Sequence, residues 1–321
     1  MDTDVLFPVF KRTGRSPGKY RAGFIDRSGC LKIDYLYQDA RSFRCELASV
    51  MLNDKWGAMD AAGDIRIPFL AGSPLQLSEG RAVYSLEGRR GVLDFSGHVL
   101  CEPRYDTLGS FHEGVAWMSS GDLFGFLLAD GRELVPPFYE DARSFSEGMG
   151  SVKAGGKWGY INRSLSLMIP LRFDLALPFS EGLARVKQGD LYGYIDRTGE
   201  YVIPPQFPHA RDFSEGMAGA QIGGRWGFID HSGIFKIPPA FQHADGFSEG
   251  LACVHTFDRP PKVGFIDKLG KYVLPPIYDD AFSFRYGLCF VRIDDDDVVA
   301  YIDHSGRRIW SGPFVEVGLH L

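Results

Sequence analysis

The sequence predicts an all-β protein, built as a single tandem array of about nine three-stranded antiparallel repeats over residues 1–321. A phrase of the form aromatic–Gly–aromatic–Ile–Asp recurs with six spacings of 34 residues, followed by spacings of 37 and 36. The flanking segments alternate apolar and polar side chains as strands do, and helical periodicity is absent. A fixed period of this size indicates that each repeat buries its apolar face against its neighbours. The glycine of the phrase occurs at Gly23, Gly57, Gly91, Gly125, Gly159, Gly193, Gly227 and Gly264, and Ala300 takes the ninth place.

Residues 182–216 represent one repeat. Residues 183–187 alternate with period two, which predicts a first strand, and residues 188–190 (Gln-Gly-Asp) predict a turn. Residues 192–196 are apolar on both faces and therefore predict a central second strand. The first two strands thus form a hairpin around the phrase.

The second half of the repeat begins with residues 196–199 (Asp-Arg-Thr-Gly), whose first and fourth residues favour a type I turn. Residues 201–203 predict a third strand, and Pro204-Pro205 is expected to end it because proline cannot donate to a sheet ladder. Residues 206–216 are expected to form a loop to the next repeat. Three strands are fewer than the usual four of a propeller blade, which favours a curved β-solenoid over a propeller-like array, although the pattern leaves both open.

Small residues recur at a fixed position relative to these strands. A small residue recurs two places after the loop glycine, which predicts that neighbouring backbones approach closely there, and the glycine of the second strand is expected to serve the same purpose. The column consists of Ala82, Ala116, Gly150, Ala184, Ala218 and Ala252.

Composition excludes several classes of function. The formal net charge of −6 argues against a nucleic-acid partner, and no run of about 18 apolar residues is present to span a membrane. The N-terminus, Met1-Asp2-Thr3-Asp4, is acidic where a secretory signal is basic. The five cysteines are odd in number and widely spaced, so a reducing, cytoplasmic location is the simplest expectation.

Two columns of repeated acids are candidate sites. The aspartate after the phrase is interpreted as an acceptor for backbone N–H groups of its own turn, rather than as a row of catalytic acids or metal ligands. The glutamate before the loop glycine is interpreted in the same structural way, against a negative ladder for cations or a basic partner. The columns are Asp26, Asp60, Asp94, Asp196, Asp230, Asp267 and Asp303, and Glu79, Glu113, Glu147, Glu181, Glu215 and Glu249.

One trio of residues is a weak candidate for a metal site. His209 and His243 occupy equivalent positions in adjacent repeats, and Asp280 stands at that place in the next, so stacked repeats would bring nitrogen and oxygen ligands together. The phosphate-loop, His-Glu-x-x-His and Cys-x-x-Cys patterns are absent. The expectation is therefore a protein without catalytic activity or a cofactor.

Charged residues collect where the repeats differ, in the turn between the first and second strands. The first turn is basic and the ninth is acidic, and these turns are the candidate partner-binding surface. If the array closes, the opposite charges help to close it; if it stays open, they favour head-to-tail self-association. The candidates are Lys11, Arg12, Arg15, Lys19, Arg21, Arg89, Arg90, Arg259, Asp294, Asp295, Asp296 and Asp297.

The repeated phrases resemble the bacterial WG (or KWG) repeat family. The resemblance rests on Gly-Lys-Trp-Gly-Tyr-Ile at 156–161, Gly-Arg-Trp-Gly-Phe-Ile at 224–229, Ile-Pro-Pro at 203–205 and 237–239, and Phe-Ser-Glu-Gly at 145–148, 179–182, 213–216 and 247–250. It covers nearly the whole chain and implies an interaction module. Departures argue against a function that needs an unbroken row of tryptophans. The second copy has Ile67-Pro68-Phe69 in place of a double proline, and the position before the glycine holds Trp only at 56, 158 and 226, with Ala22, Arg90, Phe124, Tyr192, Val263 and Val299 elsewhere.

Two functions follow as hypotheses. The first is a non-catalytic scaffold that binds a protein or peptide partner through the variable turns and the concave face of the array. The alternative is a small-ligand protein of the glycan-binding type, with one aromatic pocket per repeat. The sequence names neither the partner nor the process.

Overall fold

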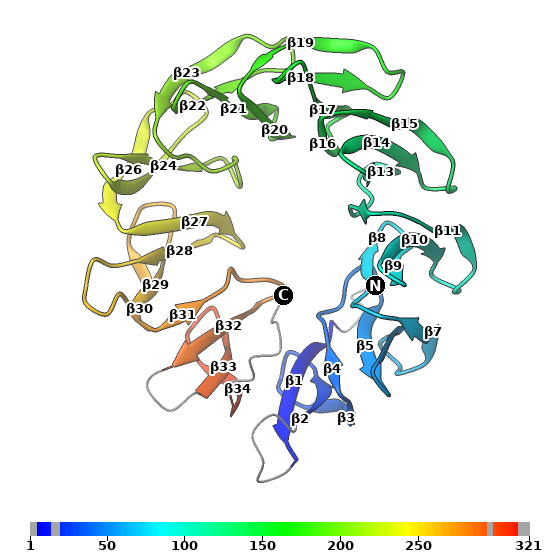
Figure 1. Ribbon diagram of the computed structural model, residues 1–321. Coiled ribbons are helices and arrows are strands. Elements are labelled where there is room, and N and C mark those ends of the chain that lie inside the picture. Colours follow the sequence, from blue (N-terminus) through cyan, green and yellow to red (C-terminus); the bar gives the residue numbers. More distant parts are fainter. Residues whose placement is uncertain (1–4, 14–19, 294–297, 314–321) are drawn as a thin grey trace. The chain divides into compact units, whose positions relative to one another are not determined.

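The computed structural model describes residues 5–13, 20–293 and 298–313, and its strands are labelled in Figure 1. The chain divides into two compact units, one within residues 1–145 and one within residues 146–314. Within the described residues the regular elements are strands, as predicted. No helix among them is long and apolar enough to cross a membrane.

The first unit contains four consecutive antiparallel sheets. Their strand orders are β1-β2-β3, β4-β5-β6-β7, β11-β10-β9-β8 and β12-β13-β14-β15. The strands are β1 (Phe7–Arg12), β2 (Tyr20–Ile25), β3 (Leu31–Tyr37), β4 (Asp39–Ala40), β5 (Ala48–Leu52), β6 (Lys55–Met59), β7 (Ile65–Ala71), β8 (Gln76–Ser78), β9 (Arg81–Leu86), β10 (Arg89–Asp94), β11 (Val99–Tyr105), β12 (Thr107–Leu108), β13 (Val115–Ser120), β14 (Leu123–Leu128) and β15 (Glu133–Tyr139), and β16 (Asp141–Ser146) spans the boundary.

The second unit repeats the same arrangement. Strands β17, β18 and β19 pair in that order, and the following sheets have the orders β20-β21-β22-β23, β24-β25-β26, β27-β28-β29-β30 and β31-β32-β33-β34. The strands are β17 (Met149–Ala154), β18 (Lys157–Asn162), β19 (Leu167–Phe173), β20 (Leu175–Ser180), β21 (Leu183–Gln188), β22 (Leu191–Ile195), β23 (Tyr201–Phe207), β24 (Ala218–Ile222), β25 (Arg225–Ile229), β26 (Phe235–Phe241), β27 (His243–Ser248), β28 (Leu251–His255), β29 (Val263–Ile266), β30 (Tyr272–Tyr278), β31 (Asp280–Ala281), β32 (Leu288–Ile293), β33 (Val298–Asp303) and β34 (Arg308–Pro313).

Most sheets have a fourth strand that the sequence analysis assigned to a loop. Strand β20 pairs with β21 across residues 175–180, and its Ala176 and Phe179 are buried. In the sheet β24-β25-β26 two isolated bridges, Ala210 to Ala220 and Ser214 to Met217, stand in the same place. A four-stranded antiparallel sheet is the blade of a β-propeller. The strand count therefore no longer favours a solenoid over propeller-type blades.

The double proline does not end the third strand, contrary to expectation. Strand β23 continues through Pro204 and Pro205, and its register with β22 shifts between the pairs Tyr194–Ile203 and Tyr192–Phe207. Four residues of β23 thus advance against two of β22, which is a bulge. The strand tolerates proline because it lies at the edge of its sheet, where an N–H donor is not needed.

This bulge explains the repeated glycine. A Cβ atom at Gly193 would lie 2.6 Å from the carbonyl oxygen of Ile203 and 2.6 Å from the nitrogen of Pro205. Close backbone approach at the glycine was predicted and is confirmed. Ala300 is tolerated because β33 and β34 stay in register at the pairs Val299–Gly312 and Ala300–Ser311, without a bulge opposite it.

The core lies between successive sheets. In the second unit the ring of Tyr194 in β22 meets that of Phe213, in the segment that leads into the next sheet, with centroids 4.9 Å apart and planes at 61°. Both side chains are at most 2% exposed, and the Tyr194 hydroxyl donates to the carbonyl of Arg211. Each repeat therefore completes the core of its neighbour, as the repeat period implied.

The repeated aspartates lie in the turns between second and third strands and bind backbone, as interpreted from the sequence. Asp196 Oδ1 accepts the N–H of Thr198 at 2.9 Å and the N–H of Glu200 at 3.1 Å. Hydrogen bonds from Thr198 lower the pKa of Asp196, and in the first unit the hydroxyl of Ser28 is the largest cause that lowers the pKa of Asp26 to about 2. These carboxylates are thus used within their own turns.

Replacing Asp196 with alanine is expected to destabilise the protein by about 1 kcal/mol, because two turn N–H groups lose their acceptor. Asp196→Asn is expected to cost less, since Asn162 accepts the N–H of Ser166 in the equivalent turn. The folded-state pKa of Asp196 is lowered, so its contribution is present above the ordinary carboxyl pKa and is lost as pH falls below it. Urea unfolding at neutral and at acidic pH measures both effects, and an equal loss at the two pH values would contradict them.

Candidate functional site

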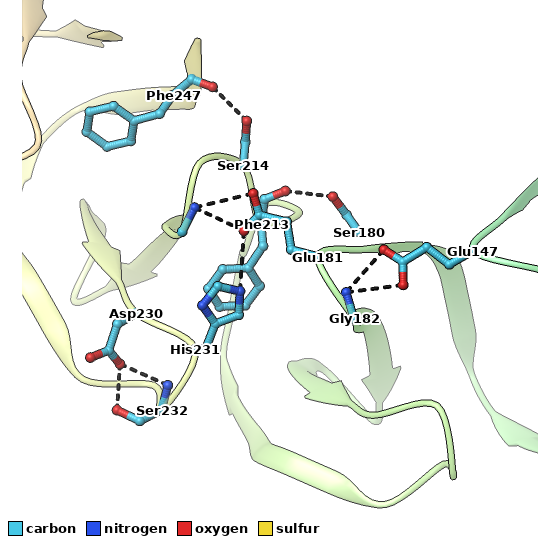
Figure 2. Close-up of polar contacts among 11 residues, drawn as sticks. Glu147, Ser180, Glu181, Gly182, Phe213, Ser214, Asp230, His231, Ser232 and Phe247 are labelled. Carbon is cyan, nitrogen blue, oxygen red and sulfur yellow. Dashed lines mark hydrogen bonds and ion pairs between the residues drawn. The ribbon is translucent and has the colours of Figure 1, made fainter. Parts of the chain in front are cut away.

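The repeated glutamates bind the turn of the following repeat. Glu181 accepts the N–H of Gly216 with its two carboxylate oxygens at 3.3 and 3.0 Å, and Glu147 accepts that of Gly182 at 3.1 and 3.2 Å (Figure 2). The imidazole of His231 lies 3.3 Å from Glu181. The structural interpretation of this column is confirmed, with the difference that each glutamate reaches the glycine of the next repeat rather than its own.

The serine of the Phe-Ser-Glu-Gly motif makes a parallel link. Ser180 Oγ donates to the carbonyl of Phe213 at 2.7 Å, and Ser214 Oγ donates to that of Phe247 at 2.7 Å (Figure 2). The motif thus joins each repeat to the next through one hydroxyl and one carboxylate. Its polar atoms thus contribute to holding successive repeats together.

The described residues of the predicted basic turn lie where β1 ends and β2 begins. Lys11 of β1 pairs with Arg21 of β2, Arg12 pairs with Tyr20, and the side chains of Lys11, Arg12 and Arg21 are exposed. The Lys11 ammonium lies 5.6 Å from the ring centroid of Tyr35. The remaining candidates of the first and ninth turns lie outside the described residues: Arg15, Lys19, Asp294, Asp295, Asp296 and Asp297.

The other variable-turn arginines have separate environments. Arg259 is exposed between β28 and β29 in the second unit. Arg89 begins β10 and forms an ion pair with Asp106. Arg90 is partly buried, and its Nη1 donates to Ser73 Oγ at 3.2 Å. The structure brings Arg89 and Arg90 to one strand but gives them different partners.

The three residues of the weak metal candidate do not form a ligand set. His243 Nε2 lies 2.7 Å from Arg211 Nη2 and 3.4 Å from Asp245 Oδ1, and its cross-strand neighbour is His255. His209 instead packs over the ring of Trp226, at 6.4 Å between centroids. Among the described residues no group of three His, Cys, Asp or Glu side chains is placed to hold a metal ion. The Arg211 guanidinium next to His243 would repel a metal cation, so His243 is poorly placed to act as a metal ligand.

Sequence reasoning missed a pairing of arginine with the repeated tryptophan. The Arg41 guanidinium lies 4.9 Å from the ring of Trp56, and that of Arg211 lies 5.5 Å from the ring of Trp226. The signal is present in the sequence, because each arginine stands 16 residues before the repeat glycine, Gly57 or Gly227. Such stacking is a cation–π contact that covers the ring.

The third repeat lacks this pair. Leu75 stands 16 residues before Gly91, where the three repeats with a tryptophan have arginine, and Arg90 stands in the place of the tryptophan. Leu75 is 5% exposed, and its N–H donates to Ser49 Oγ at 3.0 Å. A large flat ring is therefore absent at a position that Trp56 fills in the preceding repeat.

A pocket of about 410 Å³ lies beside Leu75 and Arg90 in the first unit. Three arginines, Arg41, Arg44 and Arg90, are among its lining residues, together with four serines and the apolar side chains of residues 74, 75 and 77. None of the lining residues is acidic. The pocket thus joins donors and positive charge to an apolar wall, which is the composition of a site for an anionic ligand.

Solved structures share the fold at low sequence identity. A crystal structure described as the eukaryotic initiation factor matches with a TM-score of 0.61 and 12% identity, covering 95% of this chain and 95% of that one. The dihydro-heme d1 dehydrogenase NirN, in complex with DHE, matches with a TM-score of 0.52 and 12% identity, covering 86% of this chain and 75% of that one. At these identities the likeness concerns the fold alone.

Sequence comparison identifies the family. No curated protein matches significantly. The family model described as WG containing repeat matches residues 23–56, 91–124, 124–158, 158–192, 192–226, 226–254 and 264–295. These matches cover well over half of the chain, so the protein belongs to the WG-containing repeat family.

Proposed function

We propose that the protein is a non-catalytic scaffold that binds a protein or peptide partner through the charged hairpin ends that depart from the repeat. One observation carries the proposal: repeated polar residues are consumed by the fold, whereas several non-repeated charges are exposed. Asp196, Glu181 and Ser180 each bind backbone, but Lys11, Arg12 and Arg21 extend from one hairpin. Residues exposed on a rigid scaffold are the common source of binding specificity.

The chemistry of this hairpin suits an acidic partner. Lys11, Arg12 and Arg21 lie at the end of β1 and the start of β2, and the nearby Tyr35 ring adds an apolar surface. Arginine and tyrosine are enriched among the residues that dominate interface energies. A patch of one sign also steers a partner of the opposite charge. The five cysteines are unpaired, which supports a reducing compartment such as the cytoplasm.

Reversing the three hairpin charges, K11E/R12E/R21E, is expected to weaken partner binding by about tenfold or more while leaving the fold intact. The three glutamates would repel an acidic partner. Affinity purification from native cytosol, with the co-purifying protein quantified by mass spectrometry, measures this. The matched control is R27E/K271E/R308E, three exposed residues in or beside the turns at the other end of the second strands. Full partner retention by K11E/R12E/R21E, or equal loss in the control, would contradict the proposal.

The glycan-binding alternative gains no support from the repeated tryptophans. The tryptophans before the repeat glycine are buried, with exposures of 5% at Trp56, 3% at Trp158 and 7% at Trp226, so they present no face for a sugar to stack on. A small-ligand role keeps support from one other observation, the arginine-lined pocket of the first unit. Its chemistry points to an anion rather than a neutral sugar.

A further inference from the structure

We propose that the pocket of the first unit binds the phosphate group of a small phosphomonoester, with Arg90 as its anchor. The inference goes beyond the scaffold function, because it concerns a small ligand and requires no protein partner. It rests on the replacement of the arginine and tryptophan pair by Leu75 and Arg90 in the third repeat, on the charge of the lining, and on the hydroxyl donors around it.

The pocket exists because the third repeat lacks the repeated ring. Trp56 is 5% exposed and fills its site under Arg41 in the second repeat. In the third repeat the longer, thinner side chain of Arg90 takes the position of the ring, and Leu75 takes that of the covering arginine. Both Leu75 and Arg90 line the pocket, so the exchange places a cation in its lining where other repeats have a ring.

The balance of charge identifies Arg90 as the anchor. Arg41 Nη1 already donates to Asp39 Oδ1 at 2.7 Å, so the charge of Arg41 is balanced within the fold. Arg90 donates to the neutral Ser73, and among the described residues it has no ion pair with a carboxylate. Arg44 adds further positive charge to the lining. A partly buried guanidinium without a counterion attracts an oxyanion, and its planar fork matches phosphate oxygens.

Two serines supply neutral donors beside Arg90. Ser49 is 1% exposed and lines the pocket, and its Oγ is occupied as acceptor of the Leu75 N–H. Its hydroxyl proton has no acceptor among the described residues and remains to be donated. Ser73 Oγ likewise accepts from Arg90, which leaves its proton to donate. Phosphate is acceptor-rich, so donors converging beside a guanidinium select it over a neutral ligand.

The size and the apolar wall indicate an organic ligand rather than a bare ion. The volume of about 410 Å³ lies within the range of small-molecule sites, roughly 300–1,000 Å³. Leu75, Leu77 and Pro74 form the apolar part of the lining. A phosphomonoester satisfies both parts, because its charged end meets Arg90 and its organic end covers the leucines.

Isothermal titration calorimetry of the full-length protein tests this with three probes: phenyl phosphate, inorganic phosphate and benzoate. Saturable binding of phenyl phosphate at one site is expected, with weaker binding of inorganic phosphate, which lacks the apolar part, and of benzoate, which has fewer acceptor oxygens. Tighter binding of inorganic phosphate with the same dependence on Arg90 would retain the phosphate site and overturn the organic carrier. Benzoate binding as tight as phenyl phosphate would overturn the phosphate assignment.

Two variants separate the site from general charge. Arg90→Gln is expected to weaken phenyl phosphate binding by about tenfold or more. Arg89→Gln is expected to leave it unchanged, because Arg89 is already paired with Asp106. The double variant L75R/R90W restores the regular pair without changing the net charge, so it is expected to fold, fill the pocket and abolish binding.

The outcomes are decisive for this pocket alone. Equal weakening by Arg89→Gln and Arg90→Gln, retained binding in a folded L75R/R90W, or no saturable binding of phenyl phosphate to the wild type would each overturn the proposal. None of these results bears on partner capture by Lys11, Arg12 and Arg21, so the pocket and the scaffold function fail separately.

Discussion

Replacing Phe213 with alanine is expected to lower the free energy of unfolding by about 3–5 kcal/mol, the range for removing a buried aromatic side chain. Phe213 is 2% exposed and contacts the Tyr194 ring at 4.9 Å and the His231 ring at 4.3 Å between centroids. Its carbonyl also accepts the hydroxyl of Ser180. The cavity left by alanine would therefore lie where two successive repeats join. Chemical denaturation followed by tryptophan fluorescence measures the loss.

Leu269→Ala is the matched control, because Leu269 is 77% exposed and its removal is expected to change stability by less than about 0.5 kcal/mol. If Phe213→Ala cost no more than this control, the contact between repeats would not be a source of stability. The account of how each repeat completes its neighbour would then be wrong.

Replacing Gly227 with alanine is expected to destabilise the protein by about 3 kcal/mol, at the upper end of the usual cost of overpacking. A Cβ atom there would lie 2.5 Å from the carbonyl oxygen of Ile237 and 2.7 Å from the nitrogen of Pro239. Both are backbone atoms of the bulged edge strand, so relief requires the strand to shift rather than a side chain to rotate. The shift in the denaturation midpoint measures the cost.

Gly246→Ala provides the comparison within the same unit. A Cβ atom at Gly246 would meet its nearest neighbour, Ser214 Cβ, at an ordinary distance of 3.6 Å. This substitution is therefore expected to be tolerated. Equal effects of the two substitutions would show that close approach of the edge strand does not require glycine at position 227.

Much of the fold was predictable because it depends on local patterns that recur. The spacing of the phrase located every repeat glycine, and the Asp-x-x-Gly turns were read correctly from Asx chemistry. The fourth strand was missed because its apolar residues, such as Ala176 and Phe179, are few and are interrupted by a register shift with β21. The double proline misled for a related reason, since an edge position is a property of the sheet and not of the local sequence.

The candidate site was less predictable, because it depends on which residues meet across strands. Arg90 was singled out for the charge of its turn, but its position next to Ser73 could not be read from sequence spacing. The sequence shows Leu75 and Arg90 as departures from the repeat. That they replace a stacked pair became clear only from the contact between Arg41 and Trp56. The candidate set of His209, His243 and Asp280 failed for the same reason, since Arg211, from the segment between β23 and β24, meets His243.

The central claim is that repeated residues hold the fold and non-repeated charges bind the partner. The most direct test measures partner retention and unfolding midpoint together for the wild type, D196A and K11E/R12E/R21E. The account predicts that D196A lowers the midpoint but keeps the partner on the folded protein, whereas K11E/R12E/R21E keeps the midpoint and loses the partner. Loss of the partner in folded D196A, with full retention in K11E/R12E/R21E, would contradict it.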